Sequence, residues 1–410
     1  MDSTETLGLD AGRLCVSLAR RRTALRSLGH GQLQSRVVKA LSRVATNLLS
    51  SPNPLSPADS RAQGPNEAAW ISLKAMLASW NESALWSLID SEGARAPDDG
   101  PSVVLHVVAA NTPLLAWSSV ARSLLVEAAS IVRLPSDAPN IRAWADVFVK
   151  NLSIVDSELA ELVELVTWPS SDLETTRSYC LAADAVLVYG SDETVAQFAE
   201  LVPAGRRLLG YGDMLSFGLV LPGSDLDKAA SGCALDIALF DQEGCLSPQM
   251  IFVIGDSSAV SGFCSLLYQR LADLKYLASE RSVGDAVEIR DAAAIAQFEI
   301  GVEVMQDWDL SFTVLRHADV PSSLLRGRGV VHIVEADTVK NVVSMVRNWN
   351  LEYKVQGVSI AGPNTRLIGA AATELEEIRV SYVCDPGRLQ TPPFEWRENG
   401  LAVLSSLISD

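Results

Sequence analysis

Cys245 is the residue in this sequence best placed to act as a nucleophile. It follows Gly244 and precedes Pro248, in a short polar stretch between an apolar helical pattern and an apolar strand pattern. Glycine and proline at this spacing indicate a tight connection rather than a core segment. A thiolate on such a loop can attack an acyl carbon. Because Asp241 and Glu243 lie nearby and oppose thiolate formation, backbone N–H groups of the loop are expected to compensate.

The other cysteines and the histidines show no catalytic pattern. Cys233 and Cys264 lie on apolar helical stripes, where a free cysteine usually acts as a small hydrophobic residue. His106 lies inside an apolar run and is expected to be a core residue. The HExxH, GxSxG and Walker P-loop motifs do not occur. Zinc proteases, α/β-hydrolases and P-loop NTPases are therefore disfavoured, and no metal site is predicted.

Polar residues follow three apolar runs at points where a sheet could bind a ligand. Asn111 comes after the first run, and its amide could donate to an oxyanion, although asparagine is also a common turn residue. Gly190 and Ser191 open a helix after another run, a geometry that can bind a pyrophosphate. Arg133 ends a third run, with Ser136 soon after it. Its guanidinium could hold a phosphate or form an ordinary surface ion pair.

Alternating strand and helix patterns must position these residues. Residues 103–108 form a continuous apolar run that is typical of a strand buried on both faces. Thr112-Pro113 then begins a helix, and strand patterns return at 131–134 and 184–189. This alternation predicts an α/β protein with a parallel sheet that binds ligands at the carboxyl ends of its strands.

Composition limits the partners that we expect. The 410 residues favour two domains. With 33 basic and 50 acidic residues, the net charge of -17 disfavours nucleic acid and anionic membranes. Residues 103–134 are the most apolar stretch, but polar and charged residues interrupt them, so no membrane span is predicted. Six cysteines without a CxxC pair, and an amino terminus without a signal-peptide pattern, lead us to expect a cytoplasmic protein.

Taken together and in this order, the motifs resemble a known family. The chain resembles the LuxC-type acyl-CoA reductases, a branch of the aldehyde dehydrogenase superfamily, over about residues 100–400. The block around Cys245 is the most specific, and the tail at 387–400 also resembles the family's carboxyl terminus. The segments that carry the resemblance are 107–114, 132–136, 188–194, 210–217 and 241–249.

The resemblance implies roles for these residues. Cys245 would attack an acyl thioester and expel the carrier thiol, and hydride from NADPH would then release an aldehyde. Asn111, with the backbone N–H of Cys245, would hold the oxyanion. The residues implied near the pyrophosphate and the adenosine ribose, where a basic group favours NADP, are Gly190, Ser191, Arg133 and Ser136.

Departures from related patterns refine this expectation. Aldehyde-oxidising relatives carry a water-activating glutamate before the cysteine, whereas the matching region, residues 209–212, contains no acid. Its absence favours reduction over hydrolysis. The family usually has lysine in place of Arg133, and the chain also differs from it near 213–214. Two alternatives stay open: an oxidative aldehyde dehydrogenase, and a non-catalytic subunit that binds an acyl-activating partner.

The expected architecture is aldehyde-dehydrogenase-like, with a Rossmann-type cofactor domain, an α/β catalytic domain and a helical N-terminal region. The implied substrate is an acyl-CoA or acyl-carrier thioester, with an acyl-activating or acyl-transferring protein as a further partner and a homo-oligomer as the assembly. The acyl group and the carrier stay open. The predicted parts are a helical region at 1–100, an NADP-binding domain at 101–240, a catalytic domain at 241–370 and an extended arm for oligomerisation at 371–410.

Overall fold

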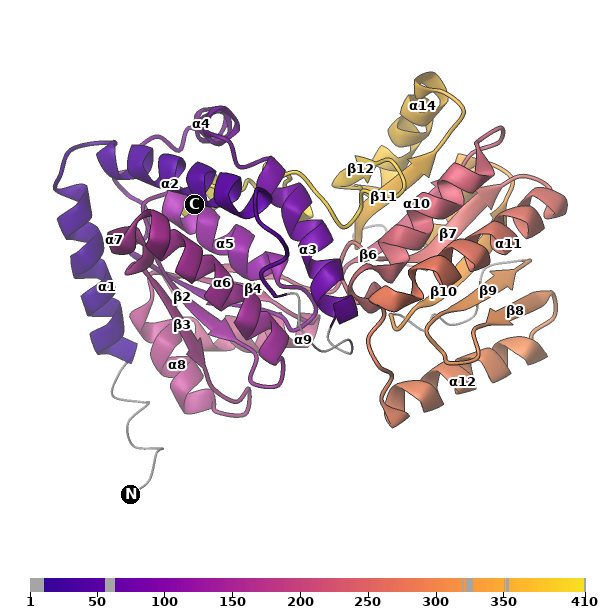
Figure 1. Ribbon diagram of the computed structural model, residues 1–410, viewed down its shortest axis with the longest axis horizontal. Coiled ribbons are helices and arrows are strands. Elements are labelled where there is room, and N and C mark those ends of the chain that lie inside the picture. Colours follow the sequence, from indigo (N-terminus) through magenta and orange to yellow (C-terminus); the bar gives the residue numbers. More distant parts are fainter. Residues whose placement is uncertain are drawn as a thin grey trace. The chain divides into compact units, whose positions relative to one another are not determined.

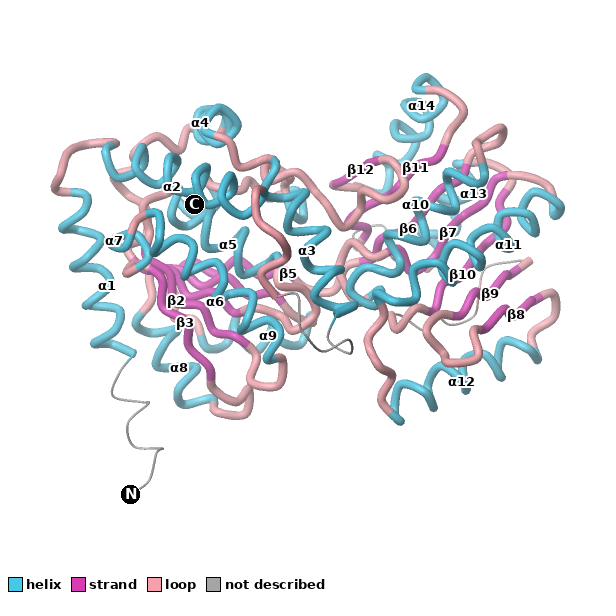
Figure 2. Tube along the Cα trace, in the orientation of Figure 1, coloured by secondary structure: helices cyan, strands magenta, loops and turns pink. Residues whose placement is uncertain are grey.

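The computed structural model describes most of the chain as two compact units, shown in Figures 1 and 2. The described residues are 11–55, 63–318, 321, 327–349, 351 and 354–408. The first unit comprises Met1–Leu55, Leu73–Asp213 and Pro393–Asp410. The second unit comprises Ser56–Ser72 and Met214–Pro392.

The first unit contains a five-stranded sheet in the order β3-β2-β1-β4-β5. All of its neighbouring strands are parallel. The central strand is buried along its whole length, which explains the continuous apolar run in its sequence. The strands are β1 (Val103–Val107), β2 (Ala129–Leu134), β3 (Val163–Thr167), β4 (Ala185–Tyr189) and β5 (Arg207–Tyr211).

Helices cover both faces of this sheet (Figure 1). α5 and α6 pack on one face, with α2 outside them, while α1, α8 and α9 cover the other. The helices are α1 (Ala11–Arg26), α2 (Gln32–Leu49), α4 (Glu82–Ser91), α5 (Leu114–Leu125), α6 (Pro139–Val155), α7 (Ser157–Ala160), α8 (Leu173–Ala182), α9 (Asp192–Leu201) and α15 (Ser405–Ile408). α3 (Gln63–Ala78) contributes residues to both units.

His106 is a core residue of β1, as the sequence predicts. Its Nδ1 contacts the hydroxyl of Ser119, and its Nε2 lies 3.2 Å from Ser130 Oγ and 3.3 Å from Ser123 Oγ. Burial lowers the pKa of His106 to about 3, because the charged imidazolium would lose its hydration. The ring is therefore a neutral hydrogen-bonding group of the core and has no free position for catalysis.

The second unit contains a seven-stranded sheet in the order β12-β11-β6-β7-β10-β9-β8. Its strands are parallel except for the antiparallel pair of β8 and β9. The strands are β6 (Leu215–Val220), β7 (Pro248–Ile254), β8 (Val302–Gln306), β9 (Thr313–His317), β10 (Val330–Ala336), β11 (Val355–Ala361) and β12 (Tyr382–Cys384).

Two apolar cores lie on opposite faces of this second sheet. α10 and α11 close one core, and α13 and α14 close the other, while α12 packs on β8 and β9. Several of these helices have an N-cap side chain. In α10, for example, the Asp225 side chain accepts the N–H of Lys228. The helices are α10 (Leu226–Ala238), α11 (Ser257–Leu274), α12 (Val283–Phe298), α13 (Val339–Asn348) and α14 (Thr365–Leu375).

The units divide the chain at different places from the domain boundaries that the sequence predicts. The division falls after Asp213 and not at 240, because β6 and α10 build the second sheet and its core. Residues 393–410 belong to the first unit and not to a separate arm at 371–410. In that unit the Phe394 ring lies 5.4 Å from Trp80, and Glu92 accepts the N–H groups of residues 403–405.

No helix in the described part of the chain combines the length and the apolar character needed to cross a membrane.

Candidate active site

Cys245 lies on the loop between α10 and β7, in the second unit. Its side chain is partly exposed, whereas Cys233 and Cys264 are buried in the core beside α10 and α11. The loop precedes β7, so Cys245 lies at the amino ends of the strands. The sequence predicts that ligands bind at the carboxyl ends of the strands. Cys245 instead lies at the amino ends of the strands of the second sheet.

The loop begins with an unusual backbone turn. Phe240, Asp241 and Gln242 have positive φ angles of 58°, 52° and 62°, a region that costs residues other than glycine roughly 1–2 kcal/mol each. The surrounding structure must hold such a turn in place. The Asp241 carboxylate does so by accepting the N–H of Ser279 at 3.1 Å and an N–H of Arg281 at 3.2 Å.

Buried glutamines hold the rest of the loop. Gln242 donates to the carbonyl of Pro248 at 2.7 Å, and Gln249 donates to the carbonyl of Gln242 at 2.9 Å. Gln390 donates to Ser247 Oγ at 2.7 Å. Since these amides carry no net charge, they fix the backbone beside Cys245 without adding a charge that would act on the thiol.

Two residues of neighbouring strands reach Cys245 directly, and sequence reasoning missed both. Ser216 in β6 donates to the carbonyl of Cys245 at 3.0 Å. Gln356 in β11 places its Nε2 3.8 Å from the sulfur of Cys245. A glutamine inside an otherwise apolar strand pattern was the available signal, because a buried polar side chain needs a partner.

The other predicted site residues lie in the first unit. Asn111 follows β1 in the turn before α5, where it is partly buried. Arg133 lies in β2, and Ser136 is exposed in the turn after it. Gly190 and Ser191 lie between β4 and α9. All five therefore gather at the carboxyl ends of parallel strands, where α/β sheets bind ligands.

The carboxyl end of β2 carries a cation that could bind a phosphate group on a ribose. Arg133 donates to the carbonyl of Trp168 at 3.0 Å, and its guanidinium lies 5.9 Å from the centre of that ring. Burial lowers the pKa of Arg133, which the charge of Asp137 partly opposes, but arginine stays a cation in proteins. The contact with Trp168 fixes the direction of a cation that could meet a phosphate.

The amino terminus of α9 is less suited to a pyrophosphate. Ser191 caps this helix by accepting the N–H of Thr194 at 3.2 Å. The N–H of Asp192 donates to the carboxylate of Asp213 at 3.3 Å, and the Asp213 N–H donates to Asp192 at 2.9 Å. A pyrophosphate here would meet two carboxylates, which oppose a further negative charge. The roles of Gly190 and Ser191 stay predictions.

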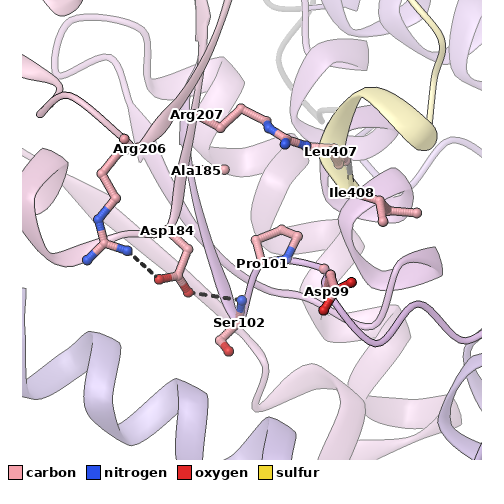
Figure 3. Close-up of a pocket in the computed structure, with 11 residues that line it drawn as sticks. Asp99, Pro101, Ser102, Asp184, Ala185, Arg206, Arg207, Leu407 and Ile408 are labelled. Atoms are coloured by element: carbon pink, nitrogen blue, oxygen red, sulfur yellow. Dashed lines mark hydrogen bonds and ion pairs between the residues drawn. The ribbon is translucent and has the colours of Figure 1, made fainter. Parts of the chain in front are cut away.

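A cavity of about 600 Å³ lies at the amino ends of the strands of the same sheet, and Figure 3 shows the residues that line it. There Asp184 pairs with Arg206 at 2.7 Å and accepts the N–H of Ser102 at 2.9 Å. Arg207 also lines the cavity and donates to the carbonyl of Ser406. None of the predicted site residues lines it, and Asp184, Arg206 and Arg207 are already paired with one another or with backbone.

Comparisons with known proteins identify the relatives of this chain. The model of a family described as acyl-CoA reductase (LuxC) matches residues 91–409. The long-chain acyl-protein thioester reductase 2 of Photobacterium leiognathi is 30% identical over 210 residues, which are 47% of this chain and 42% of that protein. The long-chain acyl-protein thioester reductase of Photorhabdus laumondii is 25% identical over 328 residues, covering 73% and 64%. The chain thus spans less than half of the first relative's length.

Solved structures with the same fold are aldehyde dehydrogenases, which confirms the predicted fold class. The NADP-dependent glyceraldehyde-3-phosphate dehydrogenase of Bacillus halodurans, complexed with NADP, has a TM-score of 0.71 at 13% identity, over 98% of this chain and 89% of that chain. The NAD-dependent benzaldehyde dehydrogenase of Corynebacterium glutamicum has a TM-score of 0.72 at 14% identity, over 98% and 87%. At these identities the likeness establishes the fold alone.

Proposed function

Because this chain belongs to the acyl-CoA reductase (LuxC) family, we propose that it reduces an acyl thioester to an aldehyde through an acyl-enzyme on Cys245. The observation that carries the proposal is a partly exposed thiol on a strained loop, which neutral amides hold in place. A cysteine that only packs in the core requires neither an exposed thiol nor a strained backbone beside it.

The chemistry assigned to Cys245 has three steps. Its thiolate attacks the carbonyl carbon of the thioester, a new carbon–sulfur bond forms, and the carrier sulfur leaves with its bonding electrons and takes up a proton. NADPH, which Arg133 and Ser136 would hold, would provide the hydride that the acyl carbon accepts. The bond to Cys245 then breaks, its electron pair returns to the sulfur, and the aldehyde is released. The oxyanion role of Asn111 rests on the resemblance alone.

Arg133 and Ser136 are assigned to the adenosine end of the cofactor. A guanidinium and a hydroxyl at the end of β2 match a ribose that carries a phosphate, which favours NADPH over NADH. Gly190 and Ser191 are assigned to the pyrophosphate by the resemblance, and the carboxylates of Asp192 and Asp213 at the same turn oppose its charge.

Tyr211 supports the reductive direction. It lies in the region, residues 209–212, that the resemblance matches to the water-activating acid of oxidising relatives, and it stacks on Tyr189 at 4.8 Å between ring centres. Burial, with the charge of Glu398 as a smaller cause, raises the pKa of Tyr211 to about 12. A phenol with this pKa stays protonated near neutral pH and cannot activate water as a base.

The substrate is proposed as an acyl group on a protein thiol, because the relatives are named acyl-protein thioester reductases. Acyl-CoA is the second substrate to compare. The test supplies both thioesters with NADPH and measures aldehyde. Turnover should fall by about 10³-fold or more in Cys245→Ser and stay near wild type in Cys384→Ser, a matched control at another partly exposed cysteine. Retained turnover in Cys245→Ser would reject the mechanism.

The same assay separates the two alternative functions. Net oxidation of added aldehyde to acid, with no reduction of thioester, would favour an oxidative dehydrogenase. Failure to bind NADPH, together with retained binding of an acyl-activating protein, would favour a non-catalytic subunit.

A further inference from the structure

We propose that Gln356 is a positioning residue whose side-chain amide stabilises the thiolate of Cys245, an inference that rests on the nucleophilic role proposed above. Gln356 lies at the start of β11, and its Nε2 is 3.8 Å from the Cys245 sulfur. This separation is within reach of a hydrogen bond to sulfur, whose electron cloud is larger than that of oxygen. An N–H that points at sulfur favours the charged form.

The cost of burying Gln356 argues that its amide has a function. The residue is 1% exposed, and its Oε1 has no hydrogen-bond partner within the described part of the chain. A buried carbonyl oxygen without a partner destabilises a fold, and an apolar residue of similar volume would avoid this loss. A glutamine that the core does not favour, with its N–H on a candidate nucleophile, is best explained by that contact.

Strand β11 also fixes the backbone of the same cysteine. The N–H of Gly357 donates to Ser216 Oγ at 3.1 Å, and this hydroxyl in turn donates to the carbonyl of Cys245 at 3.0 Å. A Cβ on Gly357 would lie 2.8 Å from a methyl of Leu246. Gln356 therefore contacts the sulfur of Cys245, and the adjacent Gly357 contacts its carbonyl through Ser216. The absence of a side chain at Gly357 lets Leu246 pack closely against β11.

The charged groups on the loop do not provide this stabilisation. Asp241 and Glu243 are acidic and disfavour a thiolate, and the carboxylate of Asp241 is already paired with Arg281. β6 and β11 contribute a hydroxyl from Ser216 and an amide from Gln356, not a charge. The amide of Gln356 thus opposes the effect of the acidic neighbours.

The test is the pH dependence of Cys245 alkylation by iodoacetamide, with the modified peptide identified by mass spectrometry. In Gln356→Met, of similar volume, alkylation near neutral pH should be about tenfold slower than in wild type. The pH of half-maximal rate should move upward. Thermal stability should stay equal or rise, which a purely structural role would not produce. Gln306→Met, in β8, is the matched control and should keep the wild-type profile.

Two further variants make the outcome decisive. Gln356→Glu places a carboxylate at the sulfur and should slow alkylation further above the pH at which it ionises. Gln356→Asn keeps a buried amide, but its side chain is one methylene shorter and no longer reaches the sulfur. It therefore provides a second measurement of the alkylation profile if Gln356→Met does not fold. An unchanged alkylation profile in Gln356→Met or Gln356→Asn overturns the proposal. Since alkylation needs no turnover, this result is independent of whether Cys245→Ser retains reductase activity.

Discussion

At the scale of single residues, the proposed chemistry depends on a cysteine whose side chain and carbonyl are contacted by neutral donors. Gln356 contacts the sulfur, and Ser216 contacts the carbonyl of Cys245. Asp241, which the sequence identifies as a hindrance to thiolate formation, is paired with Arg281. Its carboxylate holds the left-handed turn at 240–242 in place. The sequence suggests only that Asp241 disfavours a thiolate, whereas the structure shows that it also stabilises the loop.

The pair of Asp241 and Arg281 gives a prediction about stability. Arg281→Met should lower the free energy of unfolding by roughly 3 kcal/mol, because it leaves a mostly buried carboxylate without its cation. Urea denaturation measures this loss. Arg270→Met is the control, since its ion pair with Asp227 is exposed, and it should change stability by less than about 1 kcal/mol. Equal losses in the two variants would contradict the role given to Arg281.

At the scale of elements, α10 connects the carboxyl-terminal part of the second unit to the Cys245 loop. Asp236 in α10 accepts the N–H groups of Gly387 at 2.7 Å and Leu389 at 3.0 Å. The next residue, Gln390, donates to Ser247, two positions after Cys245. The segment that follows β12 is therefore part of the support for the candidate nucleophile.

Two helix glycines should respond to alanine with opposite signs. Alanine is favoured over glycine in a helix by roughly 1 kcal/mol. At Gly232 in α10, however, a Cβ would lie 2.5 Å from the backbone of Pro386, whereas at Gly262 in α11 it would meet nothing within 4 Å. Gly232→Ala should therefore destabilise the protein by about 1–3 kcal/mol, and Gly262→Ala should stabilise it. Thermal unfolding of both variants is the measurement, and a stabilised Gly232→Ala would refute the packing.

Asp236 gives a prediction about pH. Burial raises the pKa of its carboxyl to about 7, although the N–H groups of Gly387 and Leu389 oppose this. A folded-state pKa above the unfolded value means that the contribution of Asp236 to stability is complete below about pH 4 and lost as pH rises through about 7. Relative to Asp236→Asn, the wild type should lose stability between about pH 4 and pH 7 in urea titrations and change little above that range. A difference that does not change with pH would argue against the buried carboxyl.

The sequence predicts some elements well because their signals are local. The apolar run at 103–108 marks a strand buried on both faces, and glycine and proline mark the Cys245 loop. The contact of Gln356 with Cys245 could not be predicted, because it joins positions 111 residues apart through the order of β6, β7 and β11. Nor does the short turn at 212–214 reveal that β5 and β6 belong to different sheets.

At the scale of the whole molecule, the described residues form an aldehyde-dehydrogenase-like α/β fold with two sheets. The first unit gathers the residues proposed for the cofactor at the carboxyl ends of its strands, and the second holds Cys245. Residues 393–410 return to the first unit after the second is complete. This order explains why a prediction of consecutive domains along the sequence gives different boundaries, since a sequence pattern does not show which unit a returning segment will join.

The proposed reaction makes different demands on the molecule at each stage. Loading the acyl group requires a thioester and Cys245, whereas its release as an aldehyde also requires bound NADPH. The two stages can therefore be separated by withholding the cofactor.

The most direct test is mass spectrometry of the protein after incubation with an acyl-protein thioester in the absence of NADPH. We expect one acyl group on the peptide that carries Cys245, and its discharge as an equivalent amount of aldehyde when NADPH is added. Formation of aldehyde while Cys245 stays unmodified, or an acyl group found on a different residue, would contradict it.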